Sequence, residues 1–194
     1  VSRTTSDLAV RYNTEKVLLV NPYSLSFDGV NDYVTVADTA GLNPSVITVS
    51  AWMKATSLTV NQTEPPLVKK AGGSSGYARE HLNANNIVRF FVNIGGGWNQ
   101  SPNSATLTTG VWHHVVGTYD GATIRLYING VESGSGTVVA GVINSSSSAL
   151  NIGRDPSNTN RLFLGNLDDV RVYSRALSAA EVRTLASGQN PSTS

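Results

Sequence analysis

Apolar and polar residues alternate along most of this chain, and clusters of Gly, Asn, Pro and Ser interrupt the alternation at short intervals. A period of two residues is typical of β-strands, because successive side chains point to opposite faces of a sheet. In VITVSAWMK, one set of alternating positions is apolar and consists of Ile47, Val49, Ala51 and Met53. The positions between them are Thr48, Ser50, Trp52 and Lys54. DYVTV, NIVRFFVNIG, VWHHVVGTYD and ATIRLYING repeat the style, with YDGA and NGVE as turn signals. The pattern predicts about a dozen short strands, spaced as in a β-sandwich.

One helix is expected near the C-terminus, in LSAAEVRTLASG. Ser178 and Glu181 have the spacing of a capping box, and Leu177 with Val182 would form the hydrophobic staple that accompanies it. Gly188 can close the helix. The predicted fold class is therefore all-β, an antiparallel two-sheet sandwich with one short C-terminal helix.

The length of 194 residues suits one domain with a sizeable core. We expect this domain to occupy residues 23–188. Residues 1–22 show only weak periodicity and are interpreted as a linker or an edge strand, and residues 189–194 as a tail. VSRTTSDLAV lacks the apolar stretch of a signal peptide, so the chain is interpreted as a mature or excised domain.

Composition excludes several classes of function. The formal net charge is +1 and charged residues make up 14% of the chain, with no basic stripe to neutralise phosphates, so nucleic acid is not an expected partner. The chain has no cysteine, which excludes disulfides and thiolate metal sites. No apolar run approaches the roughly 18 residues of a membrane helix. Membrane insertion is therefore not expected.

Five segments, taken in order, resemble one family. They are SLSFDGVNDYVTV, ITVSAWMK, GVWHHVVGTYDGATIRLYINGV, LNIGRD and FLGNLDDVRVYSRALSAAEV. Together they resemble the laminin-G-like jelly rolls of the concanavalin A-like lectin/glucanase group. The resemblance covers roughly residues 23–188 and implies two stacked sheets, one of them concave, and often a bound calcium ion. It does not fix the ligand, because such folds carry many functions.

The acidic residues of FDGVND and LDDV are candidate calcium ligands. Alternation places Asp168 on the face of the valines that follow it, which we expect to be the core face, and a buried carboxylate needs a cation or several N–H donors. The resemblance implies a calcium ion between the N-terminal hairpin and an aspartate of a late strand. The predicted metal site is therefore Asp28, Gly29, Asp32 and Asp168, with oxygen ligands of the kind calcium prefers. The alternative is that the hairpin aspartates cap turns and that Asp168 pairs with an arginine.

A ligand surface is expected where aromatic and polar side chains meet. In NIGGGWNQSPN, Trp98 follows three glycines and adjoins Asn99, so its ring is either exposed for sugar stacking or folded back over the core. The remaining candidates alternate on two neighbouring strands or lie at a strand end next to a loop, where binding residues concentrate. They are Arg79, His81, Arg89, Asn93 and Arg154. A solvated strand face explains the same arginines equally well.

Catalysis is the weaker interpretation, and no catalytic residue is predicted. Glycosidases generally need two carboxyl groups about 5–9.5 Å apart. The five glutamates are scattered, and none lies near another acid at the spacing of the fold group's glucanases: Glu15, Glu64, Glu80, Glu132 and Glu181. The sequence favours a non-catalytic carbohydrate-binding or adhesion module of a larger secreted or cell-surface bacterial protein, with a polysaccharide or glycan as partner and a structural calcium. The alternative is a protein-interaction or structural spacer domain without sugar binding.

Overall fold

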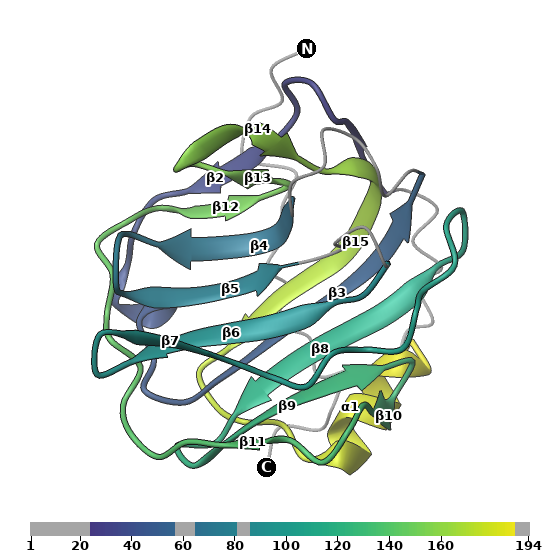
Figure 1. Cartoon of the computed structure of the whole chain (residues 1–194). Coiled ribbons are helices and arrows are strands. Elements are labelled where there is room, and N and C mark those ends of the chain that lie inside the picture. Colours follow the sequence, from purple (N-terminus) through teal and green to yellow (C-terminus); the bar gives the residue numbers. More distant parts are fainter. Residues whose placement is uncertain (1–23, 57–64, 81–85, 189–194) are drawn as a thin grey trace, which may run out of the picture.

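The computed structural model describes residues 24–56, 65–80 and 86–188, which form two antiparallel sheets stacked face to face (Figure 1). The predicted all-β sandwich with one C-terminal helix is therefore confirmed. Residues 1–22 and 189–194, predicted as a linker or edge strand and as a tail, lie outside the described residues.

The first sheet, sheet A, has seven strands within the described part of the chain. Its path is β1 (Leu25–Asp28), β15 (Leu164–Tyr173), β3 (Ile47–Ala55), β8 (His113–Tyr119), β9 (Thr123–Ile128) and β10 (Val131–Glu132), and β11 (Thr137–Val138) also pairs with β9. The first and the last strands of the described domain thus lie side by side, because β1 pairs with β15. This long-range pairing closes the fold.

The second sheet, sheet B, has six strands in the same described residues and lies in front of sheet A in Figure 1. Its order is β2 (Val34–Val36), β12 (Leu150–Ile152), β4 (Pro66–Ala71), β5 (Gly76–Glu80), β6 (Arg89–Ile94) and β7 (Gly97–Gln100). A small separate hairpin of β13 (Arg154–Asp155) and β14 (Asn158–Leu162) lies at the β12 end of this sheet. A 3₁₀ turn over Ala40–Leu42 joins β2 to β3.

The core lies between the two sheets and follows the alternation of the sequence. Ile47, Val49, Ala51 and Met53 are all at most 1% exposed, as the pattern of β3 predicts. Such inward-facing rows from both sheets form the core of a β-sandwich. The outer face of each sheet does not contribute to this core. It can therefore be covered by another part of the chain or bind a ligand.

Helix α1 (Ala179–Ala186) covers part of the outer face of sheet A (Figure 1). The predicted capping box is confirmed, since the Ser178 side chain accepts from the Glu181 N–H while the Glu181 carboxylate accepts from the Ser178 N–H. Val182 packs in a second apolar cluster with Val116 of β8 and Tyr127 of β9. No helix in the described residues is long and apolar enough to cross a membrane.

One glycine sets how closely the two sheets approach. Gly117, in the middle of β8, pairs with the core residue Val49. A Cβ atom added at this glycine would lie 2.2 Å from Cγ of the Phe90 ring in β6 of the opposite sheet. The ring therefore occupies the space that a side chain at position 117 would need.

We predict that Gly117→Ala lowers the free energy of unfolding by about 1–3 kcal/mol, the usual effect of overpacking a dense core. The measurement is urea denaturation followed by tryptophan fluorescence. Gly41→Ala is the matched control, because a Cβ atom there meets nothing within 4 Å. Equal midpoints for the two variants would contradict this account of the sheet packing.

Candidate functional site

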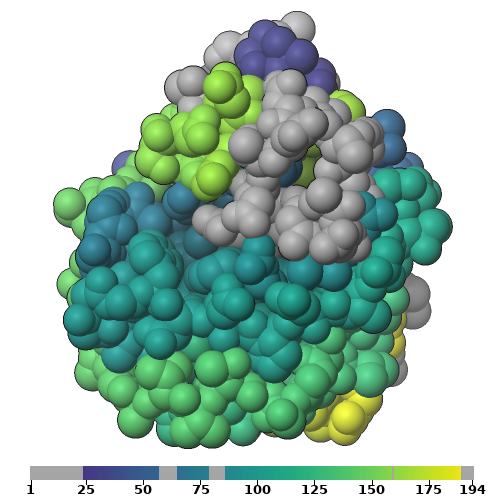
Figure 2. Space-filling model, in the orientation of Figure 1, coloured from purple at the N-terminus to yellow at the C-terminus, as the bar shows by residue number. Residues whose placement is uncertain are grey.

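The outer face of sheet B is the candidate site. Figure 2 shows this face, with a hollow between the β13–β14 hairpin and the strands β4 to β7. Sheet A carries helix α1 on its outer side, whereas no described helix lies over sheet B. The side chains of sheet B that point away from the core therefore form the candidate surface, although Asn93 and Asn151 among them are at most 2% exposed.

A polar row crosses three strands at one end of this face. Thr35 of β2 pairs with Asn151 of β12, which pairs in turn with Lys69 of β4. Side chains that are directly opposite in neighbouring strands lie about 4.5–5.5 Å apart at Cβ. The Thr35 hydroxyl donates to Asn151 Oδ1 at 3.0 Å, which joins two parts of the row directly.

Arg154 lies over this row and is held on three sides. Its Nε donates to Asn151 Oδ1 at 2.9 Å, and its Nη2 lies 3.5 Å from the Thr35 hydroxyl. Its guanidinium carbon lies 3.5 Å from the ring centroid of Tyr33, a side chain that is 48% exposed. Stacking on an aromatic ring fixes the plane of the guanidinium and thereby directs its remaining N–H groups.

Asp155 holds the hairpin onto the sheet. Its side chain is 1% exposed, and Oδ2 lies 2.7 Å from Lys69 Nζ and 3.3 Å from Arg161 Nη1. Oδ1 accepts from the backbone N–H of Ser157 at 2.9 Å and from its hydroxyl. Burial by itself would raise the pKa of Asp155, but the Lys69 ammonium and the Ser157 donors outweigh burial and hold the pKa below its ordinary value.

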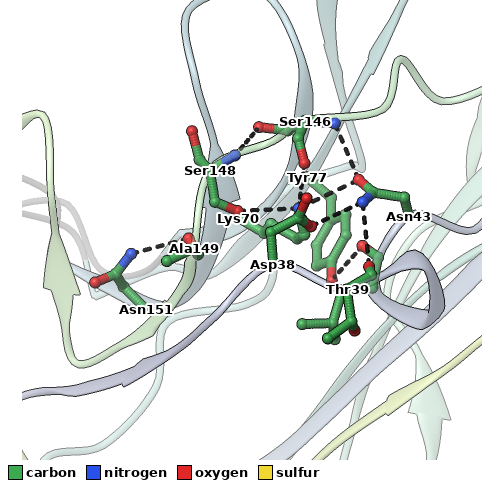
Figure 3. Close-up of polar contacts among 10 residues, drawn as sticks. Asp38, Thr39, Asn43, Lys70, Tyr77, Ser146, Ser148, Ala149 and Asn151 are labelled. Atoms are coloured by element: carbon green, nitrogen blue, oxygen red, sulfur yellow. Dashed lines mark hydrogen bonds and ion pairs between the residues drawn. The ribbon is translucent and has the colours of Figure 1, made fainter.

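A buried lysine anchors the loop that precedes the row (Figure 3). Lys70 is 0% exposed, and its ammonium lies 2.8 Å from Asp38 Oδ1 and 3.2 Å from Asn43 Oδ1. It also donates to the backbone carbonyls of Ser146 and, at 3.0 Å, Ser148. The hydrogen bond from Lys70 lowers the pKa of Asp38, so the two groups form a paired charge rather than an isolated one.

The anchored loop leads directly into the polar row. Asn151 Nδ2 donates to the Ala149 carbonyl at 3.0 Å, one residue beyond the Ser148 carbonyl that Lys70 holds (Figure 3). This bond turns Oδ1 of Asn151 toward Thr35 and Arg154. The buried Lys70 ammonium thus helps to position side chains that it does not contact.

Trp98 lies at the opposite edge of the same face. It is 42% exposed, and the β6–β7 turn that precedes it contains Gly95 and Gly96 with φ of 60° and 83°. Its partner in the ladder is Asn93, which is 0% exposed and whose two amide atoms make no hydrogen bond with a described residue. Because buried amides are normally paired, an unpaired one beside an exposed indole marks this edge as a candidate for binding.

The neighbouring candidates divide between the two faces of the edge. Arg89 lies 5.4 Å from the Phe91 ring centroid and donates to Gln100 at 3.4 Å, so it belongs to the face of Trp98. Asn99 pairs with the core residue Val92 and donates to the Gly97 carbonyl at 3.0 Å, which turns its side chain back onto the turn. Trp98 and Asn99 therefore point to different sides of β7.

Two of the predicted ligand residues are only partly placed. Arg79 pairs with Phe90 in the ladder, whereas Glu80 pairs with Arg89, so Arg79 and Arg89 do not share a row. The side chain of Arg79 and the whole of His81 lie outside the described residues. The suggested convergence of Arg79, His81, Arg89 and Asn93 on one face stays a prediction. Of these four residues, the structure places Arg89 and Asn93 on the same face of β6.

The FDGVND hairpin forms a tight acidic turn. Asp28 Oδ1 accepts from the backbone N–H of Val30 at 2.8 Å and of Asn31 at 3.1 Å, and Asp32 Oδ2 accepts from the Asp28 N–H at 3.0 Å. These backbone donors lower the pKa of Asp28. Gly29 has a φ of 72°, which suits a glycine in this turn. The arrangement matches the turn-capping alternative, and it leaves a second oxygen on each carboxylate.

The prediction that Asp168 faces the core is wrong. The register of β15 against β3 shifts between Asp168 and Arg171, and Asp169 adopts a φ of 49°. This β-bulge adds a residue and interrupts the alternation on which the prediction depended. Leu167 before the bulge is fully buried, whereas Asp168 pairs with Trp52 and lies on the outer side of the sheet.

Asp168 is also distant from the acidic hairpin. Asp28 pairs with Leu164, four residues before Asp168 along β15, which corresponds to about 13 Å at about 3.3 Å per residue. Within the described residues, no group of three or more His, Cys, Asp or Glu side chains is arranged to hold a metal ion. The four-residue set of Asp28, Gly29, Asp32 and Asp168 does not fit one calcium ion.

Sequence reasoning named a candidate at each end of the face but missed the residues that hold Arg154 in place. Arg154 and Trp98 were both expected, and they lie on the same side of sheet B. Tyr33, Thr35 and Asn151 were not expected, although LNIGRD places Asn151 three residues before Arg154. That spacing gives no signal until the pairing of β2 with β12 is known, because Thr35 is 116 residues away from Asn151.

Comparison with known proteins identifies the family. The model of the concanavalin A-like lectin/glucanases superfamily, of laminin-G type, matches residues 28–183. This confirms the resemblance expected from the five segments. A search of curated protein sequences finds no match.

Solved structures with the same fold include several binding domains. The binding domain of Paraclostridial mosquitocidal protein 1 aligns with a TM-score of 0.68 at 19% identity, over 85% of this chain and 43% of that one. Domain 4 of AbnA, a GH43 extracellular arabinanase from Geobacillus stearothermophilus, is solved in complex with arabinotriose. It aligns with a TM-score of 0.66 at 22% identity, over 84% of this chain and 76% of that one. A heptameric SAP-like pentraxin from Limulus polyphemus aligns with a TM-score of 0.66 at 17% identity, over 85% of this chain and 82% of that one. At these identities the likeness shows the fold alone, and the chain spans less than half of the mosquitocidal binding domain.

The Asp155 cluster predicts how stability depends on pH. The folded-state pKa of Asp155 is below its ordinary value of 3.8, so its ionised form stabilises the fold above that pH, and this stabilisation is lost as the pH falls through the folded-state pKa. We expect the free energy of unfolding of the wild type to fall in this acid range, and Asp155→Asn to flatten that part of the profile. Urea titrations at several pH values measure the free energy of unfolding of both proteins. An unchanged pH profile in the variant would contradict the assignment.

Proposed function

Because the chain belongs to the concanavalin A-like lectin/glucanase superfamily, we propose that it is a non-catalytic carbohydrate-binding module that uses the outer face of sheet B. The observation that carries the proposal is the pairing of two exposed aromatic residues, Tyr33 and Trp98, with polar side chains on one face. Aromatic rings stack on the apolar C–H faces of sugars, and amide, hydroxyl and guanidinium groups pair with their hydroxyls. Sites of this kind combine an apolar platform with a few placed polar groups.

The spacing of the two edges suits an extended chain. Five strand-to-strand steps separate β2, which follows Tyr33, from β7, which contains Trp98. At about 4.8 Å per step the edges lie about 24 Å apart. A glycan that lies across the strands would therefore contact both edges over several sugar units, with Tyr33 and Arg154 near one end and Arg89 near the other.

Hydrolysis is not part of the proposal. A glycosidase needs one carboxyl group as acid and a second as base or nucleophile. Among the side chains described on this face, the carboxylate is that of Asp155, which is 1% exposed and neutralised by Lys69 and Arg161. A carboxylate so buried and paired neither reaches a glycosidic oxygen nor keeps a proton to donate to it.

The setting of the domain is also proposed. One solved structure of the same fold is described as part of an extracellular enzyme, and others are binding domains of toxins. These likenesses support a secreted or cell-surface protein in which this chain supplies binding. A bacterial source and a larger parent protein follow from the same reasoning and belong to the proposal.

The test of the proposal is a glycan array, followed by calorimetry on the glycans that bind. Trp98→Ala should weaken binding about five- to tenfold, since stacking on an aromatic side chain contributes about 1–3 kcal/mol for nucleobases and a sugar should be near the lower end. Trp98→Phe should keep most of the affinity. Trp112→Ala is the matched control, because Trp112 directly precedes β8 of the other sheet in the sequence. This variant should bind glycans as the wild type does.

Two outcomes would count against it. Absence of binding to any glycan would favour the protein-interaction or spacer function. Binding that survives Trp98→Ala but is lost in Trp112→Ala would move the site to sheet A.

Calcium is retained as a proposal for the acidic hairpin alone. Asp28 and Asp32 would be its carboxylate ligands, with carbonyl groups near Gly29 and water completing a shell of six to eight oxygens, as is usual for this ion. Bound there, calcium would join β1 to the start of β2 as a structural element. Asp168 has no part in this version of the site.

We predict that calcium raises the melting temperature of chelator-treated protein, because an ion that binds only the folded state adds about 2.7 kcal/mol at a hundredfold excess over Kd. Differential scanning fluorimetry with EGTA or calcium measures the shift. Asp32→Asn should remove it and Asp168→Ala should retain it. If the melting temperature changes with neither calcium nor chelator, Asp28 and Asp32 serve only to cap the turn.

A further inference from the structure

We propose that the Tyr33–Arg154 end of the face binds the carboxylate of an acidic sugar, so that the glycan recognised by this domain contains uronic or sialic acid. This inference rests on the proposed glycan binding and specifies its ligand. It concerns the basic cluster, defined as Lys69, Arg154, Arg161 and Asp155.

Asp155, the carboxylate of the basic cluster, is already engaged by two of its cations. Asp155 lies within 3.3 Å of both Lys69 and Arg161. Arg154 makes no ion pair with any carboxylate of the described residues. Its polar contacts are the neutral oxygens of Asn151 and Thr35.

Arg154 presents donors in the geometry that a carboxylate requires. A guanidinium has five N–H groups, and the contacts to Asn151 and Thr35 engage one on Nε and one on Nη2. The other N–H group of Nη2 and both of Nη1 are not used by described residues. A carboxylate accepts two parallel bonds from such a fork, which makes the contact strong and specific in direction.

The fork is fixed before any ligand arrives. The guanidinium is stacked on Tyr33 at 3.5 Å, and Asn151 Oδ1 is itself oriented by the bond from Nδ2 to the Ala149 carbonyl. Preorganisation of this kind lowers the entropy lost on binding. Tyr33 is 48% exposed, so part of its ring remains available to pack against the sugar that bears the carboxylate.

A neutral glycan would not need this arrangement. Sugar hydroxyls are satisfied by neutral amide and hydroxyl groups, and they do not require a charged guanidinium. An arginine that pairs with no described carboxylate, and that is held in place beside an exposed ring, is suited to an anion. Its planar fork matches a carboxylate in a way that the point charge of a lysine does not.

The experiment compares one polymer in two charge states, with binding measured by calorimetry. Polygalacturonate carries a carboxylate on each ring, and its methyl ester carries none on the same rings. We expect wild-type protein to bind the acid at least tenfold more tightly than the ester, as is typical of hydrogen bonds to charged groups. Sialyllactose and lactose form the second pair, which distinguishes sialic from uronic acid as the source of the carboxylate.

Variants locate the effect. Arg154→Gln should reduce binding of the acid about tenfold and leave binding of the ester unchanged, whereas Arg154→Lys should recover only part of the loss. Arg125→Gln is the matched control, because Arg125 is an ion-paired arginine of β9 in the other sheet. Circular dichroism and the urea midpoint of each variant show that the fold is kept.

Three results would overturn the inference. They are equal affinity for acid and ester, a preference for the acid that survives Arg154→Gln, and stronger binding of dextran sulfate that does not depend on Arg154. Failure of the glycan-binding function itself has a different signature. In that case neither acidic nor neutral glycans bind, whereas Trp98-dependent binding of neutral glycans without a preference for acids would leave the function standing and overturn only this inference.

Discussion

The burial of the Lys70 ammonium is the constraint on which the candidate site depends. An unpaired charge at this depth would be costly, so the chain must bring Asp38, Asn43 and two backbone carbonyls around it. Those groups come from two loops that are distant in sequence. Satisfying one ammonium therefore fixes both loops at the end of the sandwich (Figure 3).

The consequences extend to the outer face of sheet B. The loop that Lys70 holds continues into β12, where Asn151 joins the Ala149 carbonyl below to Thr35 and Arg154 above. Lys69, the preceding residue, points to the other side and pairs with Asp155. Two adjacent lysines thus serve the two sides of one strand, one anchoring the interior and the other the β13–β14 hairpin.

The two sheets differ in what covers them, and this difference is the reason for proposing sheet B as the binding face. On sheet A, helix α1 packs against Val116 and Tyr127, and the Thr48 hydroxyl donates to the Arg175 carbonyl and accepts from the Leu177 N–H. That face is largely used for folding. The outer side of sheet B carries exposed Trp98 and Tyr33 at opposite edges, which is where a ligand has access.

The sequence by itself determined the strands and the helix, and it named Trp98 and Arg89 at one end of the face and Arg154 at the other as candidates. Alternation is a local property, so the core row of β3 and the capping box of Ser178 and Glu181 could be predicted without knowing any partner strand. Only the tertiary structure decided the rest. The row of Thr35, Asn151 and Lys69 exists because strands far apart in the chain pair in one register, and a β-bulge turned Asp168 away from the core, since one extra residue interrupts the alternation of a strand.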